Sequence, residues 1–354
     1  FDNAASACVR KRGGRTRREP VRILISAFSC MPGLGSEPGT GWGVVRQAAL
    51  RHEVCVVADR HNRPYVQAKL AARPLPGVSF VFAGSRRLYA RTAGSRLPAY
   101  LYYFLWQLHA YRAARRLHRE RPFDLVHHVT YNNSWAPSFM GRLGIPFIWC
   151  AGGREVAPHK FYRMLSWKSR VAELARTAAV RALGALVRRF TGSRASVVLS
   201  SSDPALWGGR LPVRRFLTGG LDQAEVERLR RLPERAGGPF RIASIGRLEG
   251  WKGFSLGVRA FAELQKHCPE SEYLIIGEGP ERRFLEKQAV RLGCAEKIRF
   301  LGRMPRSALL ALYGQFDVLV HPSLHEQFGY VVLEAMAAGR PVVCLACGGC
   351  GELV

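Results

Sequence analysis

Short apolar runs alternate with segments of helical length through most of the chain. In the first part, the runs have the composition of buried strands and occupy residues 21–27, 52–59, 78–84, 124–129, 146–151 and 196–201. Longer segments such as 99–120 lie between them. This alternation is typical of a parallel sheet that helices cover on both faces.

The same alternation begins again after a charged stretch at 222–239, which predicts a short helix and a linker. Strands are then predicted at 240–246, 272–277, 298–302, 316–322 and 341–346, with helices at 255–267, 281–292, 305–314 and 329–338. We therefore expect two doubly wound α/β units that face each other, at 21–221 and 240–354. Residues 1–20 lack apolar periodicity and predict a disordered basic leader.

Composition supports a globular protein of two domains. The chain has 354 residues, of which 47% are hydrophobic and 23% charged. The longest uncharged apolar stretch, 97–111, contains Pro98 and is too short to span a bilayer, so a transmembrane helix is not expected. Nine cysteines are too few for a disulfide scaffold in a chain of this length, which favours the reducing cytoplasm.

The positive charge is concentrated in the first part of the chain. Residues 1–235 hold 40 basic and 14 acidic residues, a net charge of +26, whereas residues 236–354 hold 14 and 12, a net charge of +2. An arginine-rich genome would raise both parts equally. A basic field of this size attracts nucleic acid, anionic membranes or anionic substrates.

One segment, HEQFGYVVLEAMAAGRPVV at 325–343, combines two carboxylates with a predicted helix start. Glu326 lies before the helix that follows Gly329, and Glu334 lies about one and a half turns into it. A helix N-terminus suits a phosphate, and two carboxylates can bind two sets of hydroxyls. Two ordinary surface glutamates explain the spacing equally well.

Two glycine-rich loops follow predicted strands. GRLEGWKG at 246–253 places Arg247 and Lys252 at the carboxyl end of a strand, where doubly wound sheets bind ligands, although a basic surface turn is an alternative. SCMPGLGSEPGTGWG at 29–43 has five glycines and two prolines and predicts an irregular loop. Its backbone N–H groups suit a phosphate or a sugar, but no P-loop lysine follows, and a plain mobile loop is the alternative.

Read in order, these segments resemble the donor half of retaining glycosyltransferase family 4. The series is GRLEGWKG, IIGEGPE (275–281), FLGRMPRSAL (300–309), the two-glutamate segment and CGGCGELV (347–354). The loop at 29–42 and the segment DLVHHVTYNNSWAPSFMGRLGIPFIW (124–149) also resemble bacterial members. The resemblance implies the GT-B fold, with the acceptor bound by the N-terminal domain and a nucleotide-diphosphate sugar by the C-terminal one.

The resemblance also implies individual roles. Arg247 and Lys252 match the pair that holds the donor diphosphate, and Glu326 matches the carboxylate over the donor-sugar hydroxyls. Phe328 and Gly329 match the backbone turn at the phosphate. The resemblance further implies retention of anomeric configuration and no need for a metal or other cofactor. It also implies front-face transfer, in which the leaving phosphate helps to deprotonate the acceptor. The chain has no convincing DxD pair, which agrees with that chemistry.

The resemblance also implies that Glu334 contacts the ribose of the donor, and that Gly33 and Gly35 belong to the loop beneath the diphosphate. Many members carry an active-site histidine where this chain has Val129. We expect the neighbouring His128 to take that role; a structural His127–His128 pair at a strand end is equally compatible with the sequence.

The sequence departs from the family pattern in two further ways. Gln327 stands where glycine or serine is commoner, which predicts an altered sugar pocket. The chain starts at Phe1 and ends at Val354, inside a family segment, so we expect cut ends and an incomplete second domain.

Partners follow from the same observations. Residues 159–190 mix aromatic and basic side chains before an amphipathic stretch, which predicts either contact with an anionic membrane or a solvated helix. Many relatives use lipid-linked acceptors. No nucleic-acid-binding signature is present. Cys344, Cys347 and Cys350 are spaced like part of an iron–sulfur run but lack a fourth ligand.

The leading hypothesis is a metal-independent retaining glycosyltransferase. The alternatives are an inactive, truncated basic protein that binds membrane or nucleic acid, and another GT-B enzyme such as a nucleotide-sugar epimerase.

Overall fold

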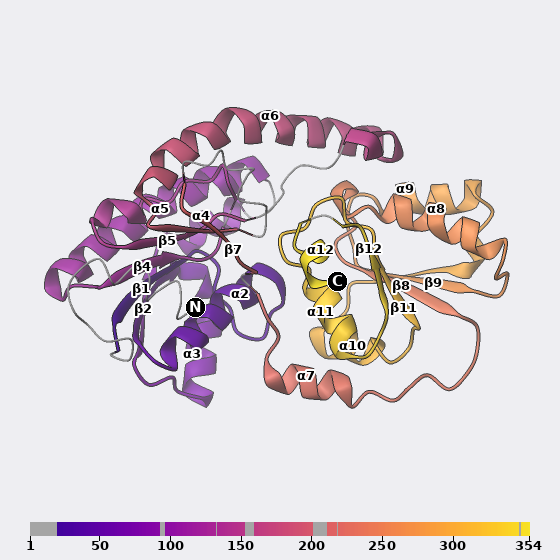
Figure 1. Cartoon of the computed structure of the whole chain (residues 1–354), viewed down its shortest axis with the longest axis horizontal. Coiled ribbons are helices and arrows are strands. Elements are labelled where there is room, and N and C mark those ends of the chain that lie inside the picture. Colours follow the sequence, from indigo (N-terminus) through magenta and orange to yellow (C-terminus); the bar gives the residue numbers. More distant parts are fainter. Residues whose placement is uncertain are drawn as a thin grey trace. The chain divides into compact units, whose positions relative to one another are not determined.

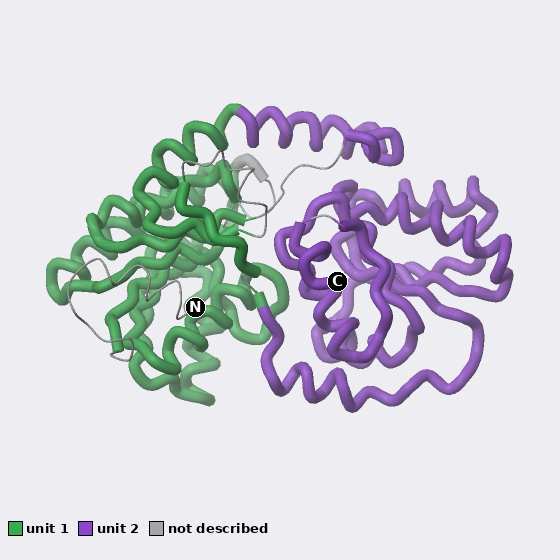
Figure 2. The backbone as a smooth tube through the Cα atoms, viewed as in Figure 1, with its two compact units in different colours: residues 1–152, 182–219 green, residues 153–181, 220–354 purple. Residues whose placement is uncertain are grey.

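The computed structural model describes residues 20–92, 96–131, 133–152, 159–200, 211–217, 219–346 and 348–354. The predicted leader, apart from Pro20, and Cys347 lie outside these residues. The chain forms two compact units, shown in Figure 2: residues 1–152 with 182–219, and residues 153–181 with 220–354.

The first unit contains a seven-stranded parallel sheet in the order β3-β2-β1-β4-β5-β6-β7 (Figure 1). Its strands are β1 (Arg22–Ala27), β2 (Glu53–Asp59), β3 (Val78–Ala83), β4 (Leu125–His128), β5 (Phe147–Cys150), β6 (Val197–Ser200) and β7 (Val213–Arg215). The helices are α2 (Ser36–Ala49), α3 (Arg63–Ala72), α4 (Arg86–Thr92) and α5 (Arg96–Glu120), with short turns η1 (Arg60–Asn62), η2 (Met140–Leu143) and η4 (Gly192–Arg194). Helix α6 (Trp167–Phe190) is divided between the units: its residues up to 181 cluster with the second unit and the rest with the first (Figure 2).

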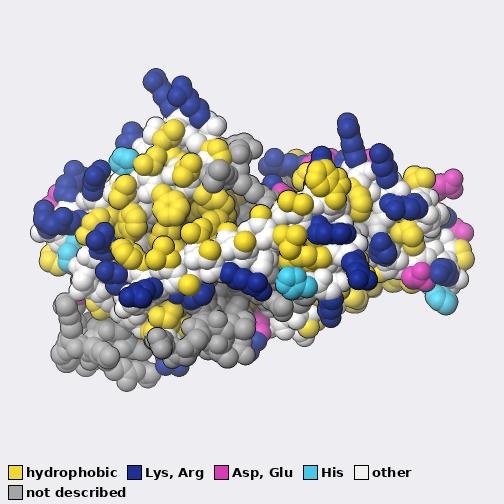
Figure 3. Space-filling view, turned by 90° about the horizontal axis from the view of Figure 1, so that it is seen from above, with side chains coloured by type: hydrophobic (Ala, Val, Ile, Leu, Met, Phe, Trp, Pro, Cys, Tyr) yellow, Lys and Arg dark blue, Asp and Glu magenta, His cyan; other side chains and the backbone are white. Residues whose placement is uncertain are grey.

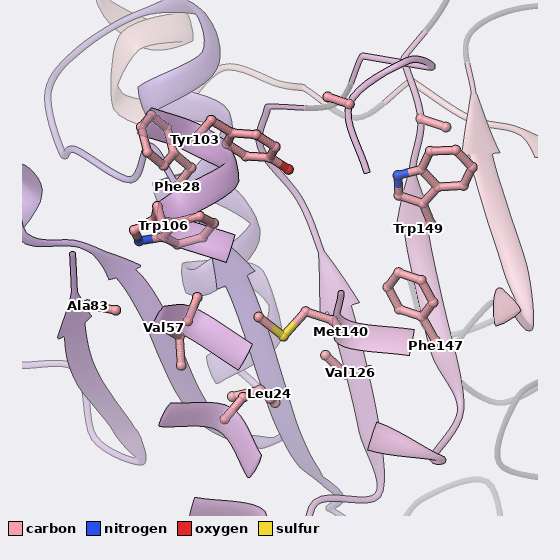
Figure 4. Packing of buried hydrophobic residues seen from close by; sticks show 14 of the residues in the cluster. Leu24, Phe28, Val57, Ala83, Tyr103, Trp106, Val126, Met140, Phe147 and Trp149 are labelled. Carbon is pink, nitrogen blue, oxygen red and sulfur yellow. The ribbon is translucent and has the colours of Figure 1, made fainter. Parts of the chain in front are cut away.

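Two apolar layers enclose this sheet because successive strand residues point to opposite faces. Ile23 and Ile25 join one buried cluster, whereas Leu24 between them joins the other. Figure 4 shows the second cluster, where Tyr103 and Trp106 of α5 lie near Phe28. Their ring centroids lie 5.5 and 5.1 Å from that of Phe28, in edge-to-face geometry.

The second unit contains a five-stranded parallel sheet in the order β10-β9-β8-β11-β12. Its strands are β8 (Arg241–Ile245), β9 (Glu272–Ile276), β10 (Ile298–Gly302), β11 (Val318–His321) and β12 (Val342–Cys344). The helices are α7 (Gln223–Arg230), α8 (Phe254–Gln265), α9 (Arg282–Arg291), α10 (Arg306–Leu312), α11 (Tyr330–Ala337) and α12 (Cys350–Leu353), with turns η3 (His159–Met164), η6 (Gly250–Lys252) and η7 (Ala295–Lys297).

The predicted doubly wound α/β class is confirmed, and each predicted strand overlaps an observed one. Strand β7 was not predicted, because a three-residue strand of sequence VRR at a sheet edge has no apolar alternation. The irregular loop predicted for 29–43 is wrong beyond residue 35, since α2 begins at Ser36.

The glycines of that segment allow helical packing rather than irregular structure. A Cβ at Gly41 would lie 2.3 Å from the carbonyl oxygen of Ser29, and one at Gly39 would lie 2.2 Å from that of Leu34. Both positions therefore require glycine for close approach of the helix to the preceding loop.

The division of the chain also differs from the sequence-based boundaries. Residues 153–181 cluster with the second unit, not with the predicted 21–221 domain. The reason is a set of tertiary contacts: Tyr162 and Leu165 pack with Leu324, and the Ser255 hydroxyl donates a 2.7 Å hydrogen bond to the carbonyl oxygen of Met164.

Candidate active site

The carboxyl ends of β8 and β11 define a candidate ligand site in the second unit. The chain runs outward from β8 to β9 and β10 on one side, and β11 and β12 occupy the other side. Such a reversal of strand order leaves a crevice between the loops that follow the two central strands. The loop after β8 carries Lys252, and the loop after β11 carries Glu326.

The structure brings these two predicted residues together. The Nζ of Lys252 donates a short hydrogen bond to Oε2 of Glu326, and both side chains are largely buried. Nε2 of His321, at the end of β11, lies 3.5 Å from the same carboxylate oxygen. Burial raises the pKa of Glu326, but Lys252 and His321 outweigh it and hold the pKa well below its usual range. Glu326 is therefore ionised at neutral pH.

Two glycine contacts hold the loops at this spacing. A Cβ at Gly253, where φ is +69°, would lie only 1.9 Å from the carbonyl oxygen of Pro322. A Cβ at Gly348 would lie 2.0 Å from the carbonyl oxygen of Glu326, and the Gly349 N–H donates a 2.9 Å hydrogen bond to that oxygen. The glycine turn of the C-terminal motif thus supports the Glu326 backbone.

Arg247 is placed differently from Lys252. Its side chain is 76% exposed and pairs with Glu249, with 2.8 Å between Nη2 and Oε1. An exposed guanidinium beside the loop can move to meet an anion, and its planar fork suits phosphate oxygens.

Phe328 and Gly329 form the turn before α11. Phe328 is buried, and Gly329 has a φ of +88° at the helix N-cap. A Cβ at Gly329 would lie 2.5 Å from Sγ of Cys350, so the position requires glycine for both conformation and packing. Cys350 itself begins α12 and is buried in the apolar core.

Glu334 lies inside α11 with its carboxylate buried. Oε1 accepts a 2.6 Å hydrogen bond from Nη1 of Arg306, and Oε2 accepts one of 2.6 Å from the Tyr313 hydroxyl. Burial raises the pKa of Glu334, and the contact with Arg306 offsets part of that rise. Sequence reasoning missed Arg306 and Tyr313, although Arg306 belongs to the FLGRMPRSAL motif. The ribose contact of Glu334 stays a prediction.

The first unit holds the other predicted residues at the carboxyl end of β1. Gly33 has a φ of +75° with open space where a Cβ would be, and Gly35 is the N-cap of α2. The Tyr131 N–H donates a short hydrogen bond to Glu37 in the first turn of α2, which ties this loop to the segment after β4.

His128 does not have the position expected of a catalytic residue. It is fully buried, with Nδ1 3.1 Å from the Ser26 hydroxyl and Nε2 3.2 Å from the Tyr103 hydroxyl. Burial lowers its pKa to about 3, and burial likewise lowers that of His127, beside Cys150, to about 3. His128 has no exposed surface with which to touch a substrate, so the structural alternative fits its environment.

Metal binding and membrane insertion are two further questions for the described part of the chain. There, no group of three or more His, Cys, Asp or Glu side chains is arranged to hold a metal ion. None of the helices among these residues combines the length and apolar character needed to cross a bilayer.

Similar folds place the molecule in a known class. A glycosyltransferase involved in lipopolysaccharide biosynthesis superposes with a TM-score of 0.55 at 18% identity, covering 94% of this chain and 83% of that one. Sucrose-phosphate synthase from Thermosynechococcus elongatus gives a TM-score of 0.52 at 19% identity, covering 93% and 82%. Together with the two parallel sheets, these likenesses define the GT-B class of fold.

The family match lies in the second unit. Residues 225–354 match the family model described as glycosyl transferases group 1. 2-Deoxystreptamine glucosyltransferase from Streptomyces kanamyceticus is 37% identical over 134 residues, which span 37% of this chain but only 34% of that protein. D-Inositol 3-phosphate glycosyltransferase from Salinispora tropica is 27% identical over 97% of this chain and 75% of its own length.

Proposed function

We propose that this chain transfers a sugar from a nucleotide-diphosphate donor to a carbohydrate, lipid-linked or small-molecule acceptor, with retention of configuration and without a metal ion. The observation that carries the proposal is the Lys252–Glu326 pair at the strand-order reversal, inside the segment that matches the family model. The narrower assignment to family 4 is part of the same proposal.

The pair supplies two complementary functions. The ammonium of Lys252 has three N–H donors, so it can keep Glu326 as a partner and still bind a phosphate oxygen. The ionised Glu326 accepts hydrogen bonds from sugar hydroxyls. Arg247, which is exposed, adds a second cation for the charge that develops on the leaving diphosphate. Two such cations perform the neutralisation that other transferases assign to a metal.

The experiment measures sugar transfer and donor hydrolysis over a panel of nucleotide sugars, with and without EDTA. UDP-glucose is the first donor to test, because an Anabaena protein of similar fold was solved with UDP and glucose. Lys252→Ala and Glu326→Gln should each lower turnover by about 100-fold or more, the usual cost of removing a donor or acceptor aimed at developing charge. The product anomer, followed by NMR, should keep the donor configuration.

A matched control is Lys266→Ala, which removes an exposed lysine of the same unit that pairs only on the surface with Glu263. Its turnover should equal that of the unmodified chain. Strict dependence on a divalent metal, an inverted product, or full activity of the Lys252 variant would each overturn the corresponding part of the proposal.

We further propose that the protein contacts an anionic membrane through α5 of the first unit. Four apolar side chains, between 37% and 59% exposed, follow one another at helical spacing: Leu101, Phe104, Leu105 and Leu108. The same face continues with exposed arginines: Arg112, Arg115, Arg116 and Arg119. Figure 3 shows apolar side chains gathered over this unit, with basic side chains at the margin.

An apolar patch beside an arginine cluster matches a bilayer surface, where acyl chains lie next to anionic headgroups. The net charge of +26 in residues 1–235 favours the same partner. In the segment predicted for this contact, 159–190, Phe161 and Leu165 pack with Leu324. Its helix α6 also exposes apolar side chains and offers a second surface for the same contact: Trp167, Val171, Leu174, Leu183, Leu186 and Phe190. We place the protein on the cytoplasmic side of the membrane.

A further inference from the structure

Residues 159–181 form a covering segment on the second unit, and one of its residues reaches the candidate donor site indirectly. Its first contacts are structural: the hydroxyls of Ser166 and Ser169 donate hydrogen bonds of 2.5 and 2.7 Å to Oε1 of Glu281. A Cβ at Gly250 would lie 2.3 Å from the Ser169 side chain, so the glycine allows the segment to lie directly on the loop that precedes Lys252.

The next helical turns place a charged group against the two site loops. Glu173, the acidic residue of this covering segment, is 2% exposed, and its Oε1 lies 3.6 Å from Nε2 of His325. Oε1 also lies 3.4 Å from Nε of Arg176 on the same helix. His325 is the residue directly before Glu326.

The His325 ring continues the contact to the other loop. It stacks on the indole of Trp251, with 4.7 Å between ring centroids and an interplanar angle of 16°. Trp251 directly precedes Lys252, whose Nζ lies 4.4 Å from the indole centroid. A line of contacts therefore runs from Glu173 through His325 and Trp251 to Lys252, and both loops of the Lys252–Glu326 pair take part in it. A second contact runs from Glu173 through Arg176 to Trp251.

This arrangement adds a constraint on the two loops to that of their own packing. A buried carboxylate needs a partner, because an uncompensated charge is costly away from water. Arg176 supplies the opposite charge, and its guanidinium carbon lies 5.8 Å from the Trp251 ring centroid. The His325 ring lies against the same carboxylate while it stacks on Trp251. Placement of Trp251 in turn limits the directions open to the neighbouring ammonium, and an anion site binds best when its donors are held in place before the ligand arrives.

We propose that Glu173 is a positioning residue for the donor diphosphate: through the His325–Trp251 stack it fixes Lys252 and Glu326 relative to each other. This inference rests on the proposed function, since it assigns a supporting role to the same site. Glu173 itself touches neither donor nor acceptor.

The test is a double-mutant cycle with UDP and inorganic pyrophosphate as probes, measured by calorimetric titration of the full chain. Glu173→Gln keeps the size of the side chain and removes its charge, and should weaken UDP binding by about tenfold, the lower end of what a lost supporting partner costs at preorganised sites. His325→Phe keeps an aromatic ring stacked on Trp251, and a phenyl ring has no polar atom that must be paired with Glu173. This variant should bind UDP nearly as well as the unmodified chain. In the His325→Phe background, Glu173→Gln should then weaken UDP binding clearly less than it does alone, because only the Arg176 contact with Trp251 remains to be disturbed.

The matched control is Ser166→Ala, which removes one hydrogen bond of the same covering segment away from the stack. It should lower thermal stability but leave UDP affinity unchanged. A KM for donor that rises in Glu173→Gln, with little change in kcat, is the kinetic counterpart of the expected result.

The outcomes separate this inference from the function on which it rests. If the unmodified chain binds UDP and Glu173→Gln binds it equally well, the positioning role is wrong and the donor site stands. If Ser166→Ala weakens binding as much as Glu173→Gln, the segment acts only as general support, and the positioning role is likewise wrong. If the unmodified chain binds neither UDP nor pyrophosphate, the donor site fails and the positioning role fails with it.

Discussion

At the scale of single residues, burial decides which of two similar side chains can do chemistry. Lys252 and Glu326 are largely buried, but each satisfies the other, so the ion pair persists and keeps both groups charged. His128 is buried among neutral partners, the hydroxyls of Ser26 and Tyr103, which cannot compensate a proton. The surroundings of Lys252 and Glu326 therefore stabilise charge, whereas the surroundings of His128 disfavour it.

The buried histidines predict a pH-dependent stability. Burial lowers the folded-state pKa of His128 to about 3, whereas an unfolded histidine titrates near 6.5. As the pH falls, the unfolded state therefore takes up a proton first. Below about pH 6.5, the free energy of unfolding should decrease by about 1.4 kcal/mol per pH unit for this residue. His127, with a pKa of about 3, should add the same loss.

Urea unfolding between mildly alkaline and mildly acidic pH measures this effect. His128→Gln should remove about half of the slope that the two histidines cause, because it removes one of the two protons taken up on unfolding. An unchanged slope would show that His128 is protonated in the folded state and would contradict the buried position. Turnover per folded molecule should be retained in this variant.

At the scale of elements, the glycines between strands and helices set the distance between the two site loops. These positions were visible in the sequence as a glycine-rich pattern, but the pattern has many explanations. Only the observed backbone shows that Gly253 needs a positive φ and that its missing side chain admits the Pro322 carbonyl. The same argument applies to the helix α2, whose glycines predicted irregular structure and instead permit close packing.

Gly253→Ala should therefore destabilise the protein by more than the backbone conformation alone explains. A positive φ costs an alanine about 1–2 kcal/mol, and here the Cβ would also collide with the Pro322 carbonyl. Gly339→Ala is the matched control, because Gly339 also has a φ of +69° but no atom within 4 Å of its Cβ position. We expect Gly253→Ala to lose at least about 3 kcal/mol of unfolding free energy and the control about 1–2 kcal/mol.

Guanidinium unfolding of the two variants checks this difference. Equal losses would mean that the loops after β8 and β11 separate easily and that their spacing does not depend on Gly253. If Gly253→Ala lowers the unfolding free energy more than Gly339→Ala does, it should also weaken donor binding, because Lys252 directly precedes Gly253.

At the scale of the whole molecule, the uneven charge and the exposed face of α5 predict behaviour that no single residue shows. The chain should bind phosphatidylcholine vesicles only when they contain phosphatidylglycerol, and binding should fall at high salt. Each arginine near such a surface contributes about 1 kcal/mol, so the double change of Arg115 and Arg116 to Gln should weaken binding by roughly tenfold or more.

Vesicle sedimentation measures this binding. Variants at the apolar positions of α5 provide a second test. Changing Leu105 and Leu108 to Ser should abolish tight binding, whereas Val290→Ser, at an apolar and still more exposed position on α9, should not. Self-association that disappears in the leucine variants, without any lipid binding by the unmodified chain, would show that this face binds a second copy instead.

The order of strands and helices, the two-unit division in outline and the separate candidacy of Lys252 and Glu326 were determined by the sequence; the contact between these two side chains was not. Each depends on local periodicity or on motifs that keep their spacing along the chain. Tertiary structure alone decided that residues 153–181 belong with the second unit, that His128 is enclosed, and that Glu334 meets Arg306 and Tyr313. Each of these three findings depends on which distant segment of the chain packs over a given side chain. The free energy of burying that side chain is set by the distant segment and not by the residues next to it in the sequence.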